Sequence, residues 1–384
     1  MKKLSLFIAS LLLTSGASFA QLNNVANIVE TGSDHVGQIH QDGLKNVANV
    51  TQSNKKNTAV VTQVNHNALN STLSDVYQSG EKNLATVKQV ADGTLTGSNA
   101  GVLKAFIDQS GDRNEALQIQ GPNVKQGKSL AEILQSGNDN YASQQQEKYG
   151  NEAKIKQTGN FNSAKQEQDL ELLPTDPGSF NKALVDQSGS YDKALQVQNG
   201  YHNVASAYQS GNKNTSTQTQ VGTNVAFVDQ SGIHNVATQT QTGQSTAFSY
   251  QPGNENTAAQ TQVGTWNSAL SIQLGNCNSS VQIQNGDLNN GIITQIGDDN
   301  YQMQMQYGNS NLATIMQSGS DNEGYQLQTG NNNKISLNQA GEMNAAITTQ
   351  EGTWNTAKID QLGKGDLSNV CQVGAGNYAE VVQQ

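Results

Sequence analysis

The chain has 384 residues and a formal net charge of −10, with 34 % hydrophobic and 14 % charged residues. So low an apolar content excludes a fold held together mainly by a large hydrophobic core, and so few charges exclude a typical disordered chain. The polarity comes from Gln, Asn, Ser, Thr and Gly, which is the composition of stacked polar ladders. Because Lys and Arg form no cluster larger than the pairs Lys2–Lys3 and Lys55–Lys56, we expect no nucleic-acid partner.

The first predicted element is a secretory signal peptide over residues 1–20. Lys2 and Lys3 form its charged start, Leu4–Leu13 is its apolar stretch, and Ala20 precedes the expected cleavage site. The apolar stretch is too short to span a bilayer, and no other segment is apolar enough to do so. We therefore expect a secreted protein without membrane insertion.

An 11-residue repeat follows the signal peptide. Its unit has Gln at position 0, Gly at +2, Asn at +5, a small residue at +7, a variable residue at +9 and Gln at +11, as in Gln350–Gln361. Positions +5, +7, +9 and +11 follow the strand period and face one side, while Thr356 and Lys358 between them face water. The four residues between Gln and Asn predict a tight turn in which Gly takes a positive φ. Each unit is therefore one strand and one turn.

Identical side chains on the inward face are expected to stack into ladders along the repeat axis. Stacked amides bond one another, which matters because an unpaired buried amide costs about 1–3 kcal/mol. We predict that these ladders form the core and drive self-assembly. The clearest predicted ladder residues are Gln251, Asn256, Gln262, Asn267, Gln273, Gln317, Asn322, Gln350, Asn355, Ala357, Ile359 and Gln361.

The full period is 22 residues, because position +9 alternates in the middle of the chain. Aliphatic residues and glutamine take turns there, in the order Ile107, Gln118, Ile133, Gln144, Ile155, Gln166, Val185 and Gln196. One strand of each turn then packs aliphatic side chains and the other packs glutamine. We count 31 strand units and predict an all-β solenoid of about 15.5 turns, with two strands per turn in two facing parallel sheets.

Irregular spacings all follow the glutamine-type strand, and therefore lie at one edge of the predicted solenoid. Four are insertions, which we expect to be edge loops near 64–74, 90–102, 121–130 and 169–180. Two further spacings are one residue short, after Gln220 and after Gln241. The remainder of the chain, residues 21–384, is predicted to be one repeat domain.

Both ends of the predicted solenoid are bare strands, whereas a monomeric solenoid needs polar caps. Unpaired strand edges template the next chain, so we expect a homopolymer formed head to tail as a cross-β fibre. Both terminal strands are of the aliphatic type, so either the junction lacks one strand or successive subunits rotate by about half a turn. The predicted terminal docking strands carry Asn24, Ala26 and Ile28 at one end and Asn377, Ala379, Val381 and Gln383 at the other.

The pattern Gln-x-Gly-x-x-Asn-x-Ala-x-x-x-Gln closely resembles the curlin repeat of curli major subunits. It occurs with little change at Gln41–Gln52, Gln78–Gln89, Gln230–Gln241, Gln251–Gln262, Gln262–Gln273 and Gln350–Gln361. The resemblance implies an extracellular functional amyloid of the bacterial biofilm matrix, which serves adhesion and surface attachment. It also implies a left-handed solenoid, a nucleating minor subunit as a partner and export through an outer-membrane secretion pore.

Chemical sites have little support in the sequence. The histidines show no metal-ligand spacing, and no group of nucleophile, acid and base interrupts the repeat, so we expect no metal, no cofactor and no catalysis. Cys277 and Cys371 should lie four turns apart, about 19 Å along the axis. That separation is too long for a disulfide, so we predict that they do not pair with each other.

An alternative function comes from threonines that are expected to point outward on the glutamine-type strands. A flat threonine array on a β-solenoid resembles ice-binding proteins, although Thr also favours exposed strand positions in general. A monomeric ice-binding or adhesin-type β-solenoid is therefore the alternative. The threonines concerned are Thr215, Thr217, Thr219, Thr238, Thr240, Thr257 and Thr261.

Overall fold

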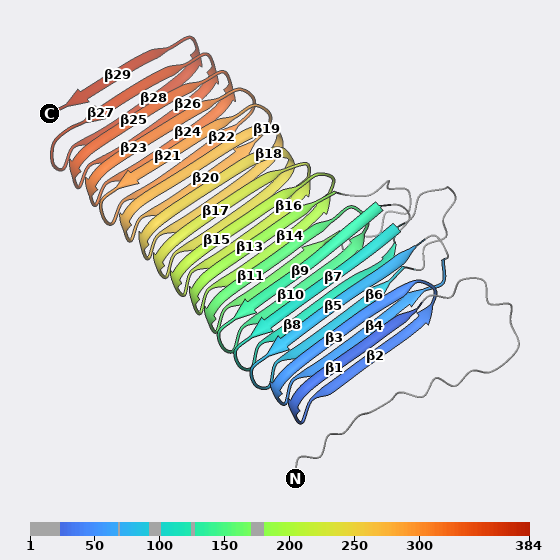
Figure 1. Ribbon diagram of the computed structural model, residues 1–384. Helices are drawn as coiled ribbons and strands as arrows, with labels where there is room; N and C mark the ends of the chain where they lie inside the picture. Colours follow the sequence, from blue (N-terminus) through green and yellow to red (C-terminus); the bar gives the residue numbers. More distant parts are fainter. Residues whose placement is uncertain (1–23, 68–69, 92–100, 124–126, 170–179) are drawn as a thin grey trace, which may run out of the picture.

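The protein forms a parallel β-solenoid of about 15 turns, seen here in a computed structural model (Figure 1). The structure describes residues 24–67, 70–91, 101–123, 127–169 and 180–384. These residues contain strands and turns only, which confirms the predicted all-β class, and among them no helix could cross a membrane. The predicted signal peptide and the middle of each predicted edge loop lie outside the described residues.

The strands stack in chain order from the N-terminal to the C-terminal end (Figure 1). Their bounds are β1 Val25–Ser33, β2 Val36–Gly43, β3 Asn46–Lys55, β4 Thr58–Asn65, β5 Ser71–Ser79, β6 Leu84–Val90, β7 Gly101–Ser110, β8 Glu115–Asn123, β9 Gly127–Ser136, β10 Tyr141–Lys148, β11 Glu152–Asn160, β12 Ser163–Gln168, β13 Lys182–Ser190, β14 Lys193–Gly200, β15 Val204–Asn212, β16 Thr215–Gly222, β17 Val225–Ile233, β18 Val236–Asn254, β19 Thr257–Asn276, β20 Ser279–Asn285, β21 Asn290–Ile296, β22 Tyr301–Tyr307, β23 Leu312–Ser320, β24 Glu323–Asn331, β25 Lys334–Glu342, β26 Ala345–Thr353, β27 Thr356–Gln361, β28 Leu367–Ala375 and β29 Tyr378–Gln383.

Strands pair in parallel with strands one full turn away. In the odd-numbered strands, β23 pairs with β21 and β25, so that Ile315 lies beside Ile293 and Leu337. In the even-numbered strands, β22 pairs with β24 and aligns Gln304 with Gln326. β18 and β19 each run through a corner, so their first halves pair with even-numbered strands and their second halves with odd-numbered ones. We call these two interleaved sets the even series and the odd series.

Burial alternates along each strand, as a two-residue period requires. In β27, Ala357 and Ile359 are buried, while Lys358 between them is exposed. The turn glycines take positive φ because the next turn passes directly over them. A Cβ on Gly319, which has a φ of 108°, would lie 2.0 Å from the carbonyl oxygen of Gly341. No other residue type fits that contact.

The two corners of each turn differ in how much their length varies. The corner after an odd-series strand has four residues between the ladder Gln and the next Asn position throughout the described chain, as in residues 318–321. The corner after an even-series strand shortens to three residues at 221–223 and 242–244, and it also receives the insertions. The register of the buried positions is unaffected by these changes.

Buried apolar residues form two large clusters, one in the N-terminal half of the solenoid and one near its C-terminal end. One buried cluster extends from Ala48 to Ala207 and another from Ile315 to Val370. In these clusters the even series also carries aliphatic residues at position +9, namely Val61, Val87 and Val370. Between the clusters, buried glutamines and serines replace most of the aliphatic side chains at this position.

Candidate assembly interface

Glutamine side chains form three continuous ladders along the solenoid axis. In the odd series, Gln317 Nε2 donates to Gln339 Oε1 at 2.7 Å, and Gln339 Nε2 donates to Gln361 Oε1 at 2.8 Å. In the even series, Gln350 Nε2 donates to Gln372 Oε1 at 2.8 Å. The third ladder runs through the +9 glutamines of the even series from Gln118 to Gln326.

Each ladder glutamine also bonds to the backbone of the other series. Gln361 Nε2 donates to the carbonyl oxygen of Ala345 in β26 at 3.0 Å, in addition to its bond along the axis. Because a carbonyl oxygen can only accept, this contact fixes which amide atom is nitrogen. All three ladders therefore point the same way, with Nε2 donating toward the C-terminal end.

Asparagines at position +5 form a second kind of ladder on the inside of each corner. Asn355 Oδ1 accepts from the backbone N–H of Asn377 at 3.0 Å. The Nδ2 group of Asn355 donates to the carbonyl oxygen of Gly374, also at 3.0 Å. The inner asparagine ladder thus presents its acceptor oxygens toward the C-terminal end.

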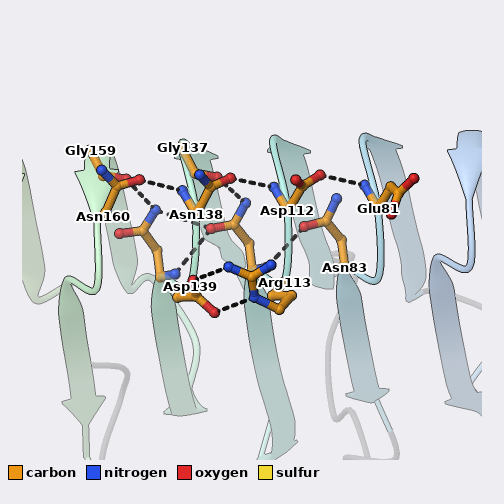
Figure 2. Close-up of polar contacts among 11 residues, drawn as sticks. Glu81, Asn83, Asp112, Arg113, Gly137, Asn138, Asp139, Gly159 and Asn160 are labelled. Carbon is orange, nitrogen blue, oxygen red and sulfur yellow. Dashed lines mark hydrogen bonds and ion pairs between the residues drawn. The ribbon is translucent and has the colours of Figure 1, made fainter.

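A further ladder, which sequence reasoning missed, lies on the outside of the corners at position +3. Figure 2 shows Asp112 Oδ1 accepting from the N–H of Glu81 at 2.8 Å, and Asn138 Oδ1 accepting from the N–H of Asp112 at 2.9 Å. The outer ladder therefore runs opposite to the inner one. Its signal in the sequence is the recurrence of Asn or Asp two residues before the +5 position, as at Asn254 and Asn276.

The twelve predicted ladder residues all lie in the interior. Each is at most 2 % exposed, for Gln251, Asn256, Gln262, Asn267, Gln273, Gln317, Asn322, Gln350, Asn355, Ala357, Ile359 and Gln361. The side-chain amides of the Gln and Asn residues in this set bond from turn to turn, and Ala357 and Ile359 pack on the same buried face.

Asp192 occupies an asparagine position in the inner ladder and is fully buried. Its Oδ1 accepts from the N–H of Asn214 at 2.8 Å, whereas its buried Oδ2 has no hydrogen-bond partner. The equivalent atom of Asn162 is a nitrogen, which donates to the carbonyl oxygen of Gly189. Burial of a carboxylate in this position raises the pKa of Asp192 to about 6.

The two ends of the described solenoid expose strand edges. β1 is exposed along its whole length, and Ile28 retains 44 % of its accessible surface. At the other end, β29 has Ala379, Val381 and Gln383 half-buried on its inward face. Asn24 Oδ1 accepts a hydrogen bond from the N–H of Asn46 at 3.0 Å, so the inner ladder begins with Asn24 within the described chain.

Other side chains considered in the sequence do not gather into a chemical site. Cys277 and Cys371 are both free and exposed, in agreement with the prediction that they do not pair. Across the described ranges, no group of three or more His, Cys, Asp or Glu residues could hold a metal ion. His35 instead takes an asparagine position, and its Nδ1 lies 3.3 Å from the backbone nitrogen of Asn57.

The outward threonines form two short rows. Thr217 lies beside Thr238, and Thr219 lies beside Thr240, which lies beside Thr261. Val236 and Ala259 interrupt the neighbouring positions of the same face. The rows are therefore narrow and do not make a continuous flat array.

Comparison with models of protein families finds a match within one part of the chain. The family model of the curlin associated repeat matches residues 308–341, which include β23, β24 and most of β25. The chain thus carries a curlin associated repeat within the solenoid. A search of curated proteins found no match.

Proposed function

We propose that the protein is a secreted structural subunit that polymerises head to tail into extracellular curli-like amyloid fibres of a biofilm matrix. The curlin associated repeat at residues 308–341 and the parallel solenoid support a structural role. The observation that carries polymerisation is the pair of open, complementary ends described next.

The directions of the ladders make the two ends chemically unlike. At the C-terminal end, Nε2 of Gln372 and of Gln383 each bond one backbone carbonyl, which leaves a second N–H to donate along the axis to a following copy. By the direction of the inner ladder, Asn377 Oδ1 can accept a hydrogen bond from that copy. At the N-terminal end, Gln41 Oε1 and the N–H of Asn24 face outward as the matching acceptor and donor. Joining unlike ends lets donors meet acceptors in the even-series glutamine ladder that begins at Gln41 and in the inner asparagine ladder, whereas joining two C-terminal ends sets donors against donors.

Aliphatic residues at the ends allow the inward faces to match across the junction. If β1 stacks on β29, Ile28 lies beside Val381, and if subunits rotate by about half a turn, β1 stacks on β28 and Ile28 lies beside Val370. Both arrangements place aliphatic against aliphatic, because Val370 replaces the glutamine of the central even series. The orientation of successive subunits along a resolved fibre distinguishes the two.

The proposed partners are other copies of this chain, a nucleating minor subunit and an outer-membrane secretion pore. The last two follow from the resemblance to curli subunits. The alternative of a monomeric ice-binding or adhesin-type protein has less support, because the threonine rows are narrow and interrupted.

Fibre diffraction and electron microscopy of the purified mature chain at neutral pH test the proposal. We expect fibres with a meridional repeat of about 4.8 Å. The variant Val381→Lys should prevent elongation, because Val381 lies on the inward face of β29. Val382→Lys is the matched control, since Val382 points outward on the same strand and is 54 % exposed. Soluble β-rich monomers that never polymerise, or equal effects of both variants, would refute end-to-end docking.

A further inference from the structure

The odd-series glutamine ladder begins with a glutamate. Glu30 stands at the ladder position of β1, directly beside Gln52 of β3. Every later turn of this series, from Gln52 to Gln383, has glutamine there. Since β1 is exposed along its whole length, Glu30 lies at the open N-terminal edge where we propose that a second copy docks.

The substitution leaves an acceptor unpaired. Gln52 Oε1 is buried and has no hydrogen-bond partner, because an ionised carboxylate has no hydrogen to donate. The neighbouring ladder at the same edge shows what is missing. There Gln41 Nε2 donates to Gln63 Oε1 at 2.9 Å, and Gln63 Nε2 continues the ladder to Gln89.

The surroundings of Glu30 offer no counter-charge. A Cβ added to Gly37 of β2 would lie 2.8 Å from Glu30 Oε1, so the carboxylate packs against that strand. The charged and titratable groups on the adjoining elements are Asp34 and His35 in the corner, His40 and Asp42 on β2, and Lys55 on β3. In the part of the chain that the structure describes, none of them forms an ion pair with Glu30.

We propose that docking of a second copy onto β1 is coupled to protonation of Glu30. In the junction, the neutral carboxyl accepts a hydrogen bond from the ladder glutamine of the preceding copy, Gln372 or Gln383. It donates its own hydrogen to Gln52 Oε1, which completes the ladder. One proton is taken up from solvent for each junction. The inference rests on the proposed head-to-tail fibre and adds its control by pH.

The physical reason is the change in environment on docking. In the free chain Glu30 is exposed to water on one side. In the junction it is enclosed between two glutamine turns, where the charged form is disfavoured and the neutral form satisfies both neighbours. Assembly that takes up a proton weakens as pH rises, so the critical concentration of the wild-type chain should increase from acid to neutral pH.

The test compares Glu30→Gln, Asp34→Asn and the wild-type chain. Critical concentration and elongation from preformed seeds are measured at several pH values between about 4 and 8, which brackets the ordinary range of a glutamate. Asp34 is the matched control because it removes one negative charge from the same end, at an exposed corner position outside the ladder. If general charge repulsion controlled assembly, the two variants would change the critical concentration equally.

We expect Glu30→Gln to lower the critical concentration at pH 7 by about tenfold and to flatten its pH dependence. Asp34→Asn should keep the wild-type pH profile. Infrared spectra of wild-type fibres at about pH 5 should contain a protonated carboxyl band that Glu30→Gln lacks. Identical pH profiles for the two variants would overturn the inference while leaving the fibre intact. Failure of all three chains to form fibres at any pH would overturn the proposed function itself.

Discussion

The centre and the flanks of the solenoid share one backbone but pack different interiors. Near the centre, the buried +9 positions hold Gln239 and Gln260 in the even series and Ser249 and Ser271 in the odd series. Toward the C-terminal end, the odd series carries Ile315, Leu337 and Ile359. The pairing register is the same in both regions. The positions common to every turn therefore determine the fold, and position +9 varies without altering it.

The two interiors are stabilised by different forces. A fully buried aliphatic side chain contributes about 1.5–3 kcal/mol through its removal from water. A buried glutamine contributes only if all its hydrogen bonds are made, and removing one partner leaves others unpaired. We therefore expect the centre to tolerate substitution less well than the flanks.

The largest expected effect breaks the polar centre. Gln239→Leu removes a donor to Gln260 Oε1 at 2.8 Å and to the carbonyl oxygen of Phe227, and an acceptor for Gln218 Nε2. Several orphaned buried groups should together lower the free energy of unfolding by about 3–5 kcal/mol, measured by urea unfolding. Ile359→Val in the apolar flank is the control and should cost about 1 kcal/mol. Equal losses for the two variants would contradict the comparison.

A second prediction concerns pH and Asp192, which lies in the ladder shared by both regions. Its folded pKa of about 6 is above the ordinary value of 3.8, so the folded state binds the proton more tightly. The stabilisation of the folded state by protonated Asp192 is therefore fully present below about pH 4. It is lost as pH rises through about 6, which lowers the free energy of unfolding by roughly 3 kcal/mol.

Asp192→Asn should remove this pH dependence, because an amide nitrogen can donate where Oδ2 has no partner. Urea unfolding at several pH values measures the effect. Asp321→Asn at a corner with positive φ serves as a control for the change in net charge. If the two variants have the same pH profile, the carboxyl of Asp192 does not carry the effect.

A third prediction concerns the N-terminal start of the polar +9 ladder, which lies within the span of the first apolar cluster. Gln118 begins the +9 ladder, and its buried Oε1 has no partner because Val87 precedes it. The amide introduced by Val87→Gln can donate to that oxygen. The amide introduced by Val61→Gln lies between Ile39 and Val87 and has no such acceptor. We expect Val87→Gln to be more stable than Val61→Gln by about 1–2 kcal/mol in urea unfolding. The reverse order would mean that side-chain volume, not ladder continuity, determines the cost.

The smallest expected effect is at the surface of the corner in Figure 2. Arg113 Nε donates to Asp139 Oδ1 at 2.7 Å, and this bond lowers the pKa of Asp139. Exposed ion pairs contribute little, so Arg113→Ala should leave the unfolding midpoint unchanged at high salt. Asn138→Ala, which removes the ladder acceptor for the N–H of Asp112, should lower the midpoint measurably. If Arg113→Ala lowered the unfolding midpoint more than Asn138→Ala, the ion pair would stabilise this corner more than the outer ladder does, contrary to the prediction.

Much of the fold could be predicted because one residue pattern satisfies two periods at once. The two-residue spacing of Asn355, Ala357, Ile359 and Gln361 indicates a strand face, and its return every 22 residues indicates stacking. The glycine at +2 indicates the turn for a steric reason that any sequence must obey. The spacing of residues and the place of glycine can both be read from the order of residues, so the strands, turns and stacking could be predicted from the sequence alone.

The rest depends on contacts between turns and could not be predicted in the same way. The direction of the glutamine ladders is set by carbonyl groups of the other series, such as that of Ala345. Position +4 takes a positive φ in residues as different as Asp321 and Trp354, because the corner geometry imposes it on any residue. Asp192 and His35 fill asparagine positions with other polar groups, so residue identity alone conceals their role.

The unequal corners have a consequence for what the rod can carry. The corner after each odd-series strand keeps one length, whereas the corner after each even-series strand shortens or lengthens without moving a buried residue. A foreign peptide grafted at 221–223 or 242–244 should therefore be displayed along a single edge. In a fibre of many copies the grafted peptide would recur at a regular spacing of one subunit length.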